Sequence, residues 1–321
     1  MKMLIIGDQH LADRPPSSRK DTYRQDILDK LIWIVEYANS MKVDLILNLG
    51  DVFHIKRSDR NSHFLVQEVA RIFGASEAPV LIVPGNHDLA AGYRLESIAS
   101  QPLGTLALHP NINLLMGPSD QFPIYGIPFV EPTVENLEYW TKKYWDDGGP
   151  TEYPFIGTHQ AIFPAAEEPV YEYVTAENWA HSFQNKYTAY GHIHSRMKMG
   201  AFYEIGGTIF CNNGAISRGS LHEETIKRKL AVTMFDDAKE DPFTSVPIPY
   251  KPAEEVFNLE AVEILKNTQN TVDAFLNSLG SSELHYLTVE GILDDARKTA
   301  LLPKQAVVEL EDIVAQVITG G

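Results

Sequence analysis

The sequence has almost no cysteine and no long apolar run, and both absences restrict what the protein can be. Cys211 is the only cysteine among 321 residues, which excludes an internal disulfide and a cysteine-rich zinc site and is typical of a reducing compartment. No segment approaches the roughly 18 consecutive apolar residues that a membrane-spanning helix needs. The apolar run at the N-terminus is too short for a signal peptide. We therefore expect a cytoplasmic protein with no membrane partner.

Positive charge is also scarce. The chain has 27 Lys and Arg residues against 43 Asp and Glu residues, a net charge of −16. Such a balance argues against a protein that coats itself in nucleic acid by bulk attraction. It still allows a local basic rim around a metal site, where bound cations add positive charge of their own.

Short apolar runs alternate with helical patterns over the first 250 residues, which is typical of stacked α and β layers. Apolar residues at helical spacing predict helices over 25–41 and 63–73. Strands are predicted over 3–7, 43–49, 80–83, 124–127, 155–158 and 187–190. A last group of strands, 202–205, 208–211 and 230–235, is expected to close a second sheet.

A proline-rich stretch marks the expected boundary between two regions. Four prolines between 241 and 252 favour a linker, so we predict a main domain over 1–240, a linker over 241–253 and a small region over 254–321. The last region has helical patterns on both sides of a strand-like segment at 284–291. Residues 251–321 include 5 basic and 12 acidic side chains, so the tail is more densely negative than the body.

Five short motifs place Asp, Asn or His directly after predicted strands. They are Gly7-Asp8-Gln9-His10, Gly50-Asp51-Val52-Phe53-His54, Gly85-Asn86-His87-Asp88, Thr158-His159-Gln160 and Gly191-His192-Ile193-His194. An open α/β sheet presents ligands in this way, beyond the carboxyl ends of its strands. Each motif alone also has an ordinary structural explanation, as a turn, a helix cap or a pair of histidines on one face of a strand. All five in this order make coincidence remote.

The residue types in these motifs suit a centre with two divalent metal ions. Carboxylate, amide and imidazole ligands together suit Mn²⁺, our first expectation, or Fe²⁺ or Zn²⁺. The ligands are too many for one tetrahedral ion but enough for two. Ions roughly 3.5–4 Å apart need a shared anionic ligand and can clamp the attacking and leaving oxygens of a phosphoryl displacement. Asp51, in the central motif, is the natural bridge.

The order of the motifs resembles that of the calcineurin-like metallophosphoesterases, over roughly residues 3 to 235. Within that superfamily the sequence is most similar to the Mre11/SbcD nucleases of DNA double-strand-break processing. The motif ending at His54 resembles the family's Gly-Asp-Leu-Phe-His, and Thr158-His159-Gln160 resembles its His-Gln strand end. The stretch from Asn213 to Arg218 lies where the family has a Pro-Gly-Ser turn followed by arginine, and Ala215 departs from that pattern.

The resemblance implies a fold and a role for each motif residue. The fold would be an α/β, four-layer α/β/β/α metallophosphoesterase sandwich with a small C-terminal α/β appendage. One metal would be held by Asp8, His10, Asp51 and His194, and the other by Asp51, Asn86, His159 and His192. His87 would stabilise the phosphate or protonate the leaving oxygen, Asp88 would orient the His87 ring, and His54 would help position the nucleic-acid strand.

Basic residues cluster in the loops that follow the metal motifs. Arg57, Arg196 and Arg218 are our candidates for binding the phosphate backbone, within a rim that also includes Arg14, Arg19, Lys20, Lys56, Arg60, Lys186 and Lys198. A solvated surface is the ordinary explanation for any one of these loops, but four loops sharing the bias favour a DNA substrate. We therefore expect a DNA nuclease, an exonuclease or endonuclease, in which a metal-bound hydroxide attacks the phosphodiester.

Two other functions stay open at this point. An enzyme of the same fold could act on a small nucleotide or another small phosphoester, and a metal-binding scaffold without turnover is a second alternative. In the Mre11/SbcD family, the region after the phosphatase domain caps the DNA site and binds an ATPase of the SbcC/Rad50 type. The tail here is short for both tasks, so we expect it to dock such a partner or to form a homodimer.

Overall fold

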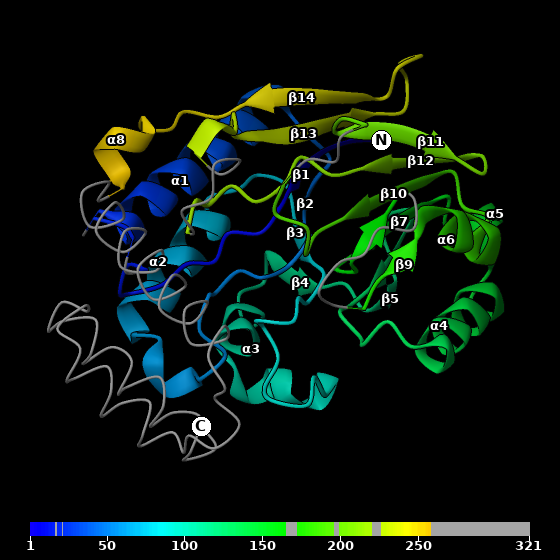
Figure 1. Ribbon diagram of the computed structural model, residues 1–321, viewed down its shortest axis with the longest axis horizontal. Helices are drawn as coiled ribbons and strands as arrows, with labels where there is room; N and C mark the ends of the chain where they lie inside the picture. The colour runs from blue at the N-terminus through cyan, green and yellow to red at the C-terminus, as the bar shows by residue number, and fades with distance from the viewer. Residues whose placement is uncertain (17, 21, 165–171, 196–198, 220–225, 258–321) are drawn as a thin grey trace, which may run out of the picture. The chain divides into compact units, whose positions relative to one another are not determined.

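The apolar runs in the first half of the chain form most of one six-stranded sheet. Four parallel strands follow one another in sequence order: β1 (Lys2–Ile6), β2 (Leu45–Asn48), β3 (Val80–Ile82) and β4 (Ile112–Leu114). β13 (Ala231–Asp236) pairs antiparallel with β1, and β14 (Phe243–Pro247) forms the edge beside it. The computed structural model describes residues 1–257 apart from 17, 21, 165–171, 196–198 and 220–225 (Figure 1).

The later apolar runs form a second six-stranded sheet. Its order is β11 (Phe202–Ile205), β12 (Thr208–Cys211), β10 (Tyr187–Tyr190), β7 (Phe155–Thr158), β6 (Ile124–Ile127) and β5 (Gly117–Pro118). The four central strands are parallel, and the strand at each edge is antiparallel to its neighbour. A separate parallel pair is formed by β8 (Ile162–Phe163) and β9 (Val174–Thr175).

Helices cover the outer face of each sheet, as Figure 1 shows. The first sheet packs against α1 (Tyr23–Met41), α2 (His63–Gly74) and α3 (Pro102–Leu106), and the second against α4 (Val134–Asp146) and α6 (Ala176–Phe183). The shorter helices are η1 (Ser58–Arg60), η2 (Leu95–Ser100), α5 (Gly149–Glu152) and α8 (Ala253–Val256). None of the helices in the described part of the chain is long and apolar enough to cross a membrane.

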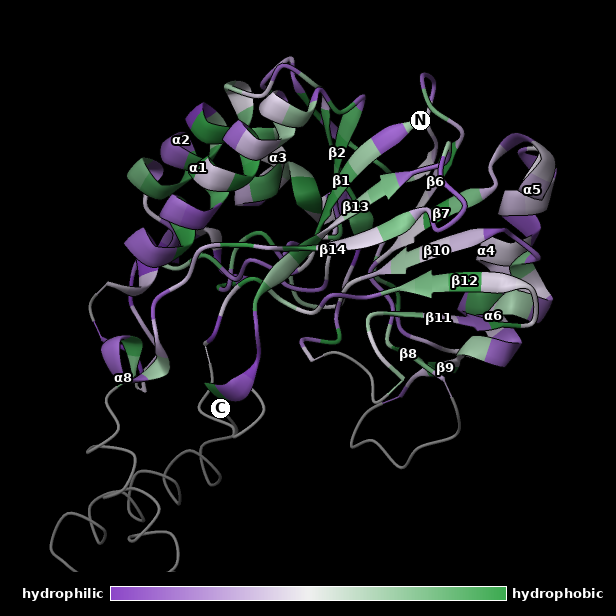
Figure 2. Ribbon diagram, turned by 90° about the horizontal axis from the view of Figure 1, so that it is seen from above, coloured by the Kyte–Doolittle hydropathy of each residue, from purple (hydrophilic) through white to green (hydrophobic). Residues whose placement is uncertain are grey.

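Alternation along β1 shows how the layers are stacked. Leu4 and Ile6 join the core beneath α1 and α2, whereas Met3 and Ile5 face the other way. Met3 and Ile5 belong to a core between the two sheets that also includes Phe155 of β7. Because successive strand residues point to opposite faces, this pattern requires apolar layers on both sides of β1. Figure 2 shows the apolar strands between the two groups of helices. The predicted α/β/β/α sandwich is confirmed.

Polar residues at three helix starts accept hydrogen bonds from the first turn. The Ser62 hydroxyl accepts a hydrogen bond from the backbone N–H of Leu65, at 3.1 Å, so α2 begins at the predicted residue. Thr133 and Thr175 cap α4 and α6 in the same way. Each cap satisfies one of the backbone donors that a helix start leaves without an intrahelical partner.

Two predictions about the last strands are wrong. β13 was expected in the second sheet but lies in the first, where Met234 is paired with Leu4 of β1. An apolar strand buried on both faces fits either sheet, so its sequence does not choose between them. The predicted linker 241–253 contains β14, which ends at Pro247. Proline is tolerated there because β14 is an edge strand, where a missing N–H breaks no ladder in the interior of the sheet.

Strands from both sheets end next to the predicted site residues. β1, β2 and β3 of the first sheet precede Asp8, Asp51 and Asn86, while β7 and β10 of the second precede His159 and His192. All five are parallel strands within their sheets, so their carboxyl ends lie at one edge of each sheet. The predicted appendage 254–321 lies outside the described residues except for 254–257.

Candidate metal centre

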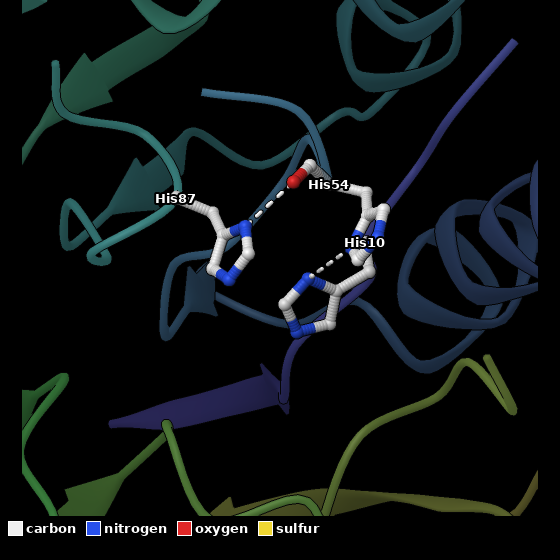
Figure 3. A group of neighbouring side chains, drawn as sticks. All are labelled: His10, His54 and His87. Atoms are coloured by element: carbon white, nitrogen blue, oxygen red, sulfur yellow. Dashed lines mark hydrogen bonds between the residues drawn. The ribbon is translucent and has the colours of Figure 1, made fainter. Parts of the chain in front are cut away.

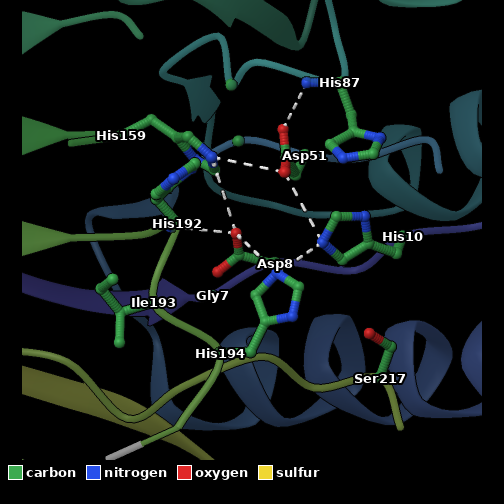
Figure 4. Close-up of polar contacts among 12 residues, drawn as sticks. Gly7, Asp8, His10, Asp51, His87, His159, His192, Ile193, His194 and Ser217 are labelled. Carbon is green, nitrogen blue, oxygen red and sulfur yellow. Dashed lines mark hydrogen bonds and ion pairs between the residues drawn. The ribbon is translucent and has the colours of Figure 1, made fainter. Parts of the chain in front are cut away.

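Side chains from both sheets converge at the ends of these strands, as Figure 4 shows. Asp8, His10, Asp51 and His194 form one group, in which a ligand atom of each lies within 4.8 Å of the others. The Nε2 atoms of His10 and His194 are 2.8 Å apart. Asp51 Oδ2 lies 3.5 Å from His10 Nε2, and Asp8 Oδ1 lies 3.9 Å from His194 Nε2. These four residues are the set predicted to hold the first metal.

A second group gathers around the amide oxygen of Asn86. This oxygen lies 3.2 Å from His159 Nε2 and 3.1 Å from His192 Nδ1. Asp51 Oδ2 is 3.3 Å from the same His159 nitrogen. One carboxylate oxygen of Asp51 therefore faces His10 in the first group and His159 in the second, which is the position that a bridging ligand requires.

The donor set fits two divalent cations. Asp8 and Asp51 are almost completely buried, and Asp8 Oδ2 has no hydrogen-bond partner within the described part of the chain. A buried carboxylate oxygen without a partner is costly unless a cation or a proton compensates its charge. Imidazole nitrogens that face one another at hydrogen-bond distance likewise suit a shared cation. The residues of the two groups described above would therefore hold the two metal ions.

The ring of His159 is oriented by the backbone. Its Nδ1 donates a hydrogen bond to the carbonyl oxygen of Leu49, at 2.5 Å, which leaves Nε2 facing Asp51 and Asn86. Burial lowers the pKa of His159, but the Asp51 and Asp8 carboxylates outweigh burial and raise it to about 9. Without a metal, this imidazole thus carries a proton at neutral pH where a cation would otherwise lie.

The pKa values of two other buried histidines, His192 and His10, are lowered and not raised. Burial, together with the neighbouring imidazole of His159, lowers the pKa of His192 to about 3. Burial also lowers the pKa of His10, with a further contribution from His194 and despite the nearby Asp51 carboxylate. Both rings are therefore neutral at pH 7, which is the protonation state in which imidazole binds a metal.

Three residues of the two groups have left-handed backbone conformations. The φ angles of His10, Asp51 and His192 are 49°, 51° and 68°. Such angles are uncommon for residues other than glycine and cost about 1–3 kcal/mol each. A Cβ atom at Gly85 would overlap Asp51 and His159, so glycine is needed there for the loops to approach. Strain of this kind is typical of functional sites held in place by the surrounding fold.

His87 lies beside the two groups, and Figure 3 shows how its ring is held. Its Nδ1 donates a hydrogen bond to the carbonyl oxygen of His54, at 2.6 Å, and its backbone N–H donates to Asp51 Oδ1, at 2.8 Å. The rings of His87 and His10 have centroids 4.8 Å apart. The His54 ring stacks on that of His87, with ring centroids 5.4 Å apart and an angle of 13° between the ring planes. Both rings line the cavity in front of His10 and His194.

The structure places Asp88 differently from the prediction. Its buried carboxylate accepts hydrogen bonds from the backbone N–H groups of Asp51, Val52 and Gly85, at 2.8, 3.1 and 2.9 Å. The His87 ring is oriented by His54 instead. Burial and the Asp51 carboxylate raise the pKa of Asp88 to about 7, against the effect of these donors. Asp88 therefore holds the loop that carries Asp51.

Replacing Asp88 by asparagine is expected to lower metal content, activity and thermal stability together. An amide N–H would face one of the backbone donors that now share this carboxylate, and a buried unsatisfied donor costs about 1–3 kcal/mol. Metal analysis, steady-state kinetics and the unfolding midpoint would measure the three effects. If Asp88 acted through the His87 ring, metal content would stay at the wild-type value while the pH profile of kcat moved.

Of the three arginines predicted to bind substrate, the structure describes two, and these differ in exposure and contacts. Arg57 is exposed and forms an ion pair with Asp59, at 2.8 Å. Arg218 is only 2% exposed, donates a hydrogen bond to the carbonyl oxygen of Lys251 and lies over the Tyr250 ring, so its predicted place on the substrate rim is wrong. Arg196 lies outside the described residues.

Arg228 is a residue at the site that motif reasoning missed. It lines the cavity with His10, His54, His87 and His194, and its guanidinium donates a hydrogen bond to the carbonyl oxygen of Ser217, at 2.7 Å. It lies outside the five ligand motifs and ten residues after Arg218, just before the strand β13 that pairs with β1. The only available signal was a basic residue shortly before a predicted strand.

A comparison of the chain with models of protein families agrees with the geometry of this centre. The model of the calcineurin-like phosphoesterase family matches residues 1–196. The chain belongs to this family. It is therefore a metal-dependent phosphoester hydrolase, and the two groups joined by Asp51 suit the two metal ions of calcineurin-like phosphoesterases.

Solved structures similar to this calcineurin-like phosphoesterase are distant in sequence. A dimetal phosphatase from Danio rerio is 15% identical, with a TM-score of 0.52 over 78% of this chain and 97% of that chain. An archaeal phosphodiesterase is 15% identical, with a TM-score of 0.38 over 78% of this chain and 100% of that chain. At these identities the likeness to the phosphatase concerns the fold and not the substrate.

Proposed function

We propose that this calcineurin-like phosphoesterase is a two-metal DNA nuclease that acts in DNA end processing, repair or recombination. The observation that carries the proposal is a groove of about 1000 Å³ lined by Arg14, Arg24 and Arg60. Ile55, the residue after His54, lines the same groove, so the groove adjoins the loop that carries His54. The narrower resemblance to the Mre11/SbcD nucleases rests on the motifs alone.

The chemistry of the groove suits a polyanion with bases. Arg14 and Arg60 are exposed, and their two guanidinium groups along one groove can contact phosphates without reading sequence, whereas the Arg24 guanidinium pairs with Asp13 at 3.0 Å. Phe64 is 53% exposed, with the Arg24 guanidinium 5.2 Å from its ring centre, and an exposed aromatic ring is a surface on which a base can stack. Asp13 and Asp59 also line the groove, so its positive charge is modest.

Each residue near the metals would have a role in hydrolysis. Two bound ions supply Lewis-acid activation of the phosphate and of the attacking water. Asp8, His10, Asn86, Asp51, His159, His192 and His194 would hold them. The His87 Nδ1 already donates to the His54 carbonyl oxygen, so Nε2 is the atom that would protonate the leaving oxygen. Arg228, which lines the same cavity, would contact a phosphate oxygen.

One observation favours the alternative of a small phosphoester. The cavity at the metal centre, lined by His10, His54, His87, His194 and Arg228, has a volume of about 190 Å³. This is large enough for one phosphate group with a small substituent. An enzyme for such a substrate would have no use for the arginine groove beyond it.

Digestion of end-labelled linear DNA with Mn²⁺ is the experiment that tests the nuclease. We expect wild-type protein to degrade the DNA and also to cleave a small chromogenic phosphodiester. Changing Arg14 and Arg60 together to alanine is expected to lower DNA cleavage roughly tenfold or more, because two phosphate contacts are lost, and to leave cleavage of the small diester unchanged. Wild-type protein that spares DNA while cleaving the small diester would establish the alternative.

Two control variants make this result specific. Lys142 on α4 is an exposed cation outside the groove, so Lys142→Ala should retain both activities. His87→Ala keeps the backbone N–H that binds Asp51 and loses only the ring. It should lower kcat on both substrates by about 10²–10⁴-fold at unchanged metal content, which shows that the activity belongs to this protein and not to a contaminant.

The metal identity and the partners are further parts of the proposal. Mn²⁺ is the proposed ion, with Fe²⁺ or Zn²⁺ as alternatives, because the ligands are carboxylate, amide and imidazole groups. From the family resemblance we also propose that the acidic tail docks an SbcC/Rad50-type ATPase or forms a homodimer. The test is ATPase binding and the oligomeric state after deletion of residues 254–321; full solubility with both unchanged would contradict this role.

A further inference from the structure

Three basic side chains are buried around one cavity that is distinct from the cavity at the metal centre. Arg19, Lys30 and Arg218 are 6%, 5% and 2% exposed. The single buried carboxylate among them is Asp26, which binds Arg19 at 3.0 Å and also Lys251 at 2.5 Å. Asp26 is thus the only buried carboxylate described for three buried basic side chains, and it is shared with a fourth cation, so the buried groups here have an excess of positive charge. Buried charges without partners are costly.

The three side chains line one cavity of about 260 Å³. Tyr250 and Lys251 line it as well, as do the buried Asp26 and the exposed Asp29, and the partial exposure of Tyr250 and Lys251 opens the cavity to solvent. The Nε atoms of Arg19 and Arg218 are buried and have no hydrogen-bond partner within the described residues. Lys30 Nζ donates to the carbonyl oxygen of Ile216, at 3.0 Å, and two of its three protons remain for other acceptors.

The electrostatics of Lys30 agree with an excess of positive charge. Burial lowers the pKa of Lys30 to about 7, and Arg218 and Arg19 lower it further while Asp26 opposes them. An acceptor with negative charge in the cavity would reverse this shift. Two guanidinium groups and one ammonium group offer forked and single donors, which match the oxygens of a tetrahedral oxyanion.

We propose that this cavity is a binding site for a phosphate group, separate from the metal centre. The group could come from inorganic phosphate or from a nucleoside monophosphate whose sugar and base extend past Tyr250 at the mouth. The volume of about 260 Å³ accommodates a phosphate group, with the lining side chains as its hydrogen-bond donors. This site does not depend on whether the protein cleaves DNA.

The cavity is joined to the metal centre through the segment around Ile216. The Ile216 carbonyl accepts from Lys30, and its backbone N–H donates to the carbonyl oxygen of Asp8, at 2.9 Å. Ser217 lines the metal-centre cavity, and Arg218 lines the phosphate cavity. A bound phosphate would therefore hold the segment that contacts the backbone of Asp8.

Calorimetric titration of the full chain after treatment with EDTA tests the site. Removing metal eliminates metal-mediated phosphate binding at the metal centre, and the His194→Ala variant reports any binding that remains there. Inorganic phosphate, sulfate and adenosine monophosphate are titrated in separate arms at constant ionic strength, with chloride as the reference. We expect saturable binding of phosphate and sulfate, and equal or tighter binding of the nucleotide if it is the natural source.

Matched variants locate the binding. Lys251→Ala removes a partly exposed cation at the mouth, so it should fold, and Arg218→Gln removes a buried one. Each should weaken phosphate binding roughly tenfold or more, the effect of losing one charge-assisted contact. His194→Ala at the metal centre and Lys142→Ala on α4 should leave it unchanged. Absence of saturable binding, or binding lost in His194→Ala and retained in Lys251→Ala, would overturn the proposal.

Discussion

Replacement of Asp51 by asparagine is expected to lower kcat/KM for phosphoester hydrolysis by roughly a thousandfold. One Asp51 oxygen faces His10 and His159 at 3.5 and 3.3 Å, so it belongs to both ligand groups. Asparagine keeps the shape of the side chain but removes the negative charge that two adjacent cations need between them. Steady-state kinetics on a chromogenic diester with Mn²⁺, together with metal analysis, would measure the loss.

The effect should be specific to this carboxylate. Asp59 lies in an exposed loop and pairs with Arg57, so Asp59→Asn should retain metal content and activity on the small diester. An Asp51→Asn protein that retained both metals and near wild-type activity would show that Asp51 is not the shared ligand.

Metal uptake is expected to release a proton and to tighten strongly as pH rises. The pKa of His159 in the metal-free protein is about 9, so between pH 7 and 9 a metal must displace its proton. Apparent metal affinity should therefore rise by about tenfold per pH unit up to pH 9 and change less above it. Calorimetry of Mn²⁺ binding in buffers of different ionisation enthalpy would count the protons released.

Without metal, the free energy of unfolding of the protein should fall as pH rises, whereas metal affinity should increase. The pKa of His159 is raised in the folded state from 6.5 to about 9, so its stabilising contribution is complete below pH 6.5 and is lost as pH rises through 9. The loss amounts to roughly 3 kcal/mol. Thermal unfolding with EDTA should show this decline, whereas Mn²⁺ should remove it. A flat profile with EDTA would mean that His159 carries no proton in the metal-free protein.

The strands and the residues at their ends could be predicted because both depend on local sequence. A short apolar run followed by glycine and a polar ligand residue specifies a buried strand and a sharp turn within about ten residues. The strands at 124–127, 155–158 and 187–190 begin and end as predicted. The convergence of Asp8, Asp51 and His159 follows from parallel strands ending at the same edge.

The errors concern contacts that local sequence does not determine. β13 pairs with β1 across more than 220 residues, and its apolar residues suit either sheet. Arg218 looked like a rim residue because arginine is usually exposed, but the segment around Lys251 covers it. Asp88 stands next to His87 in the chain, yet its carboxylate turns to the Asp51 loop. In each case the partner comes from a distant segment.

The origin of the ligands in both sheets has a consequence for how the protein matures. His10 and His194 face one another although 184 positions separate them in the chain, and β1 also needs β13 as its neighbour. A nascent chain that has emerged only as far as β4 presents Asp8, Asp51 and Asn86 without His159, His192 or His194. Closing contacts of such long range is slow compared with forming local ones. A complete ligand set for either metal therefore exists only once the second sheet has docked on the first.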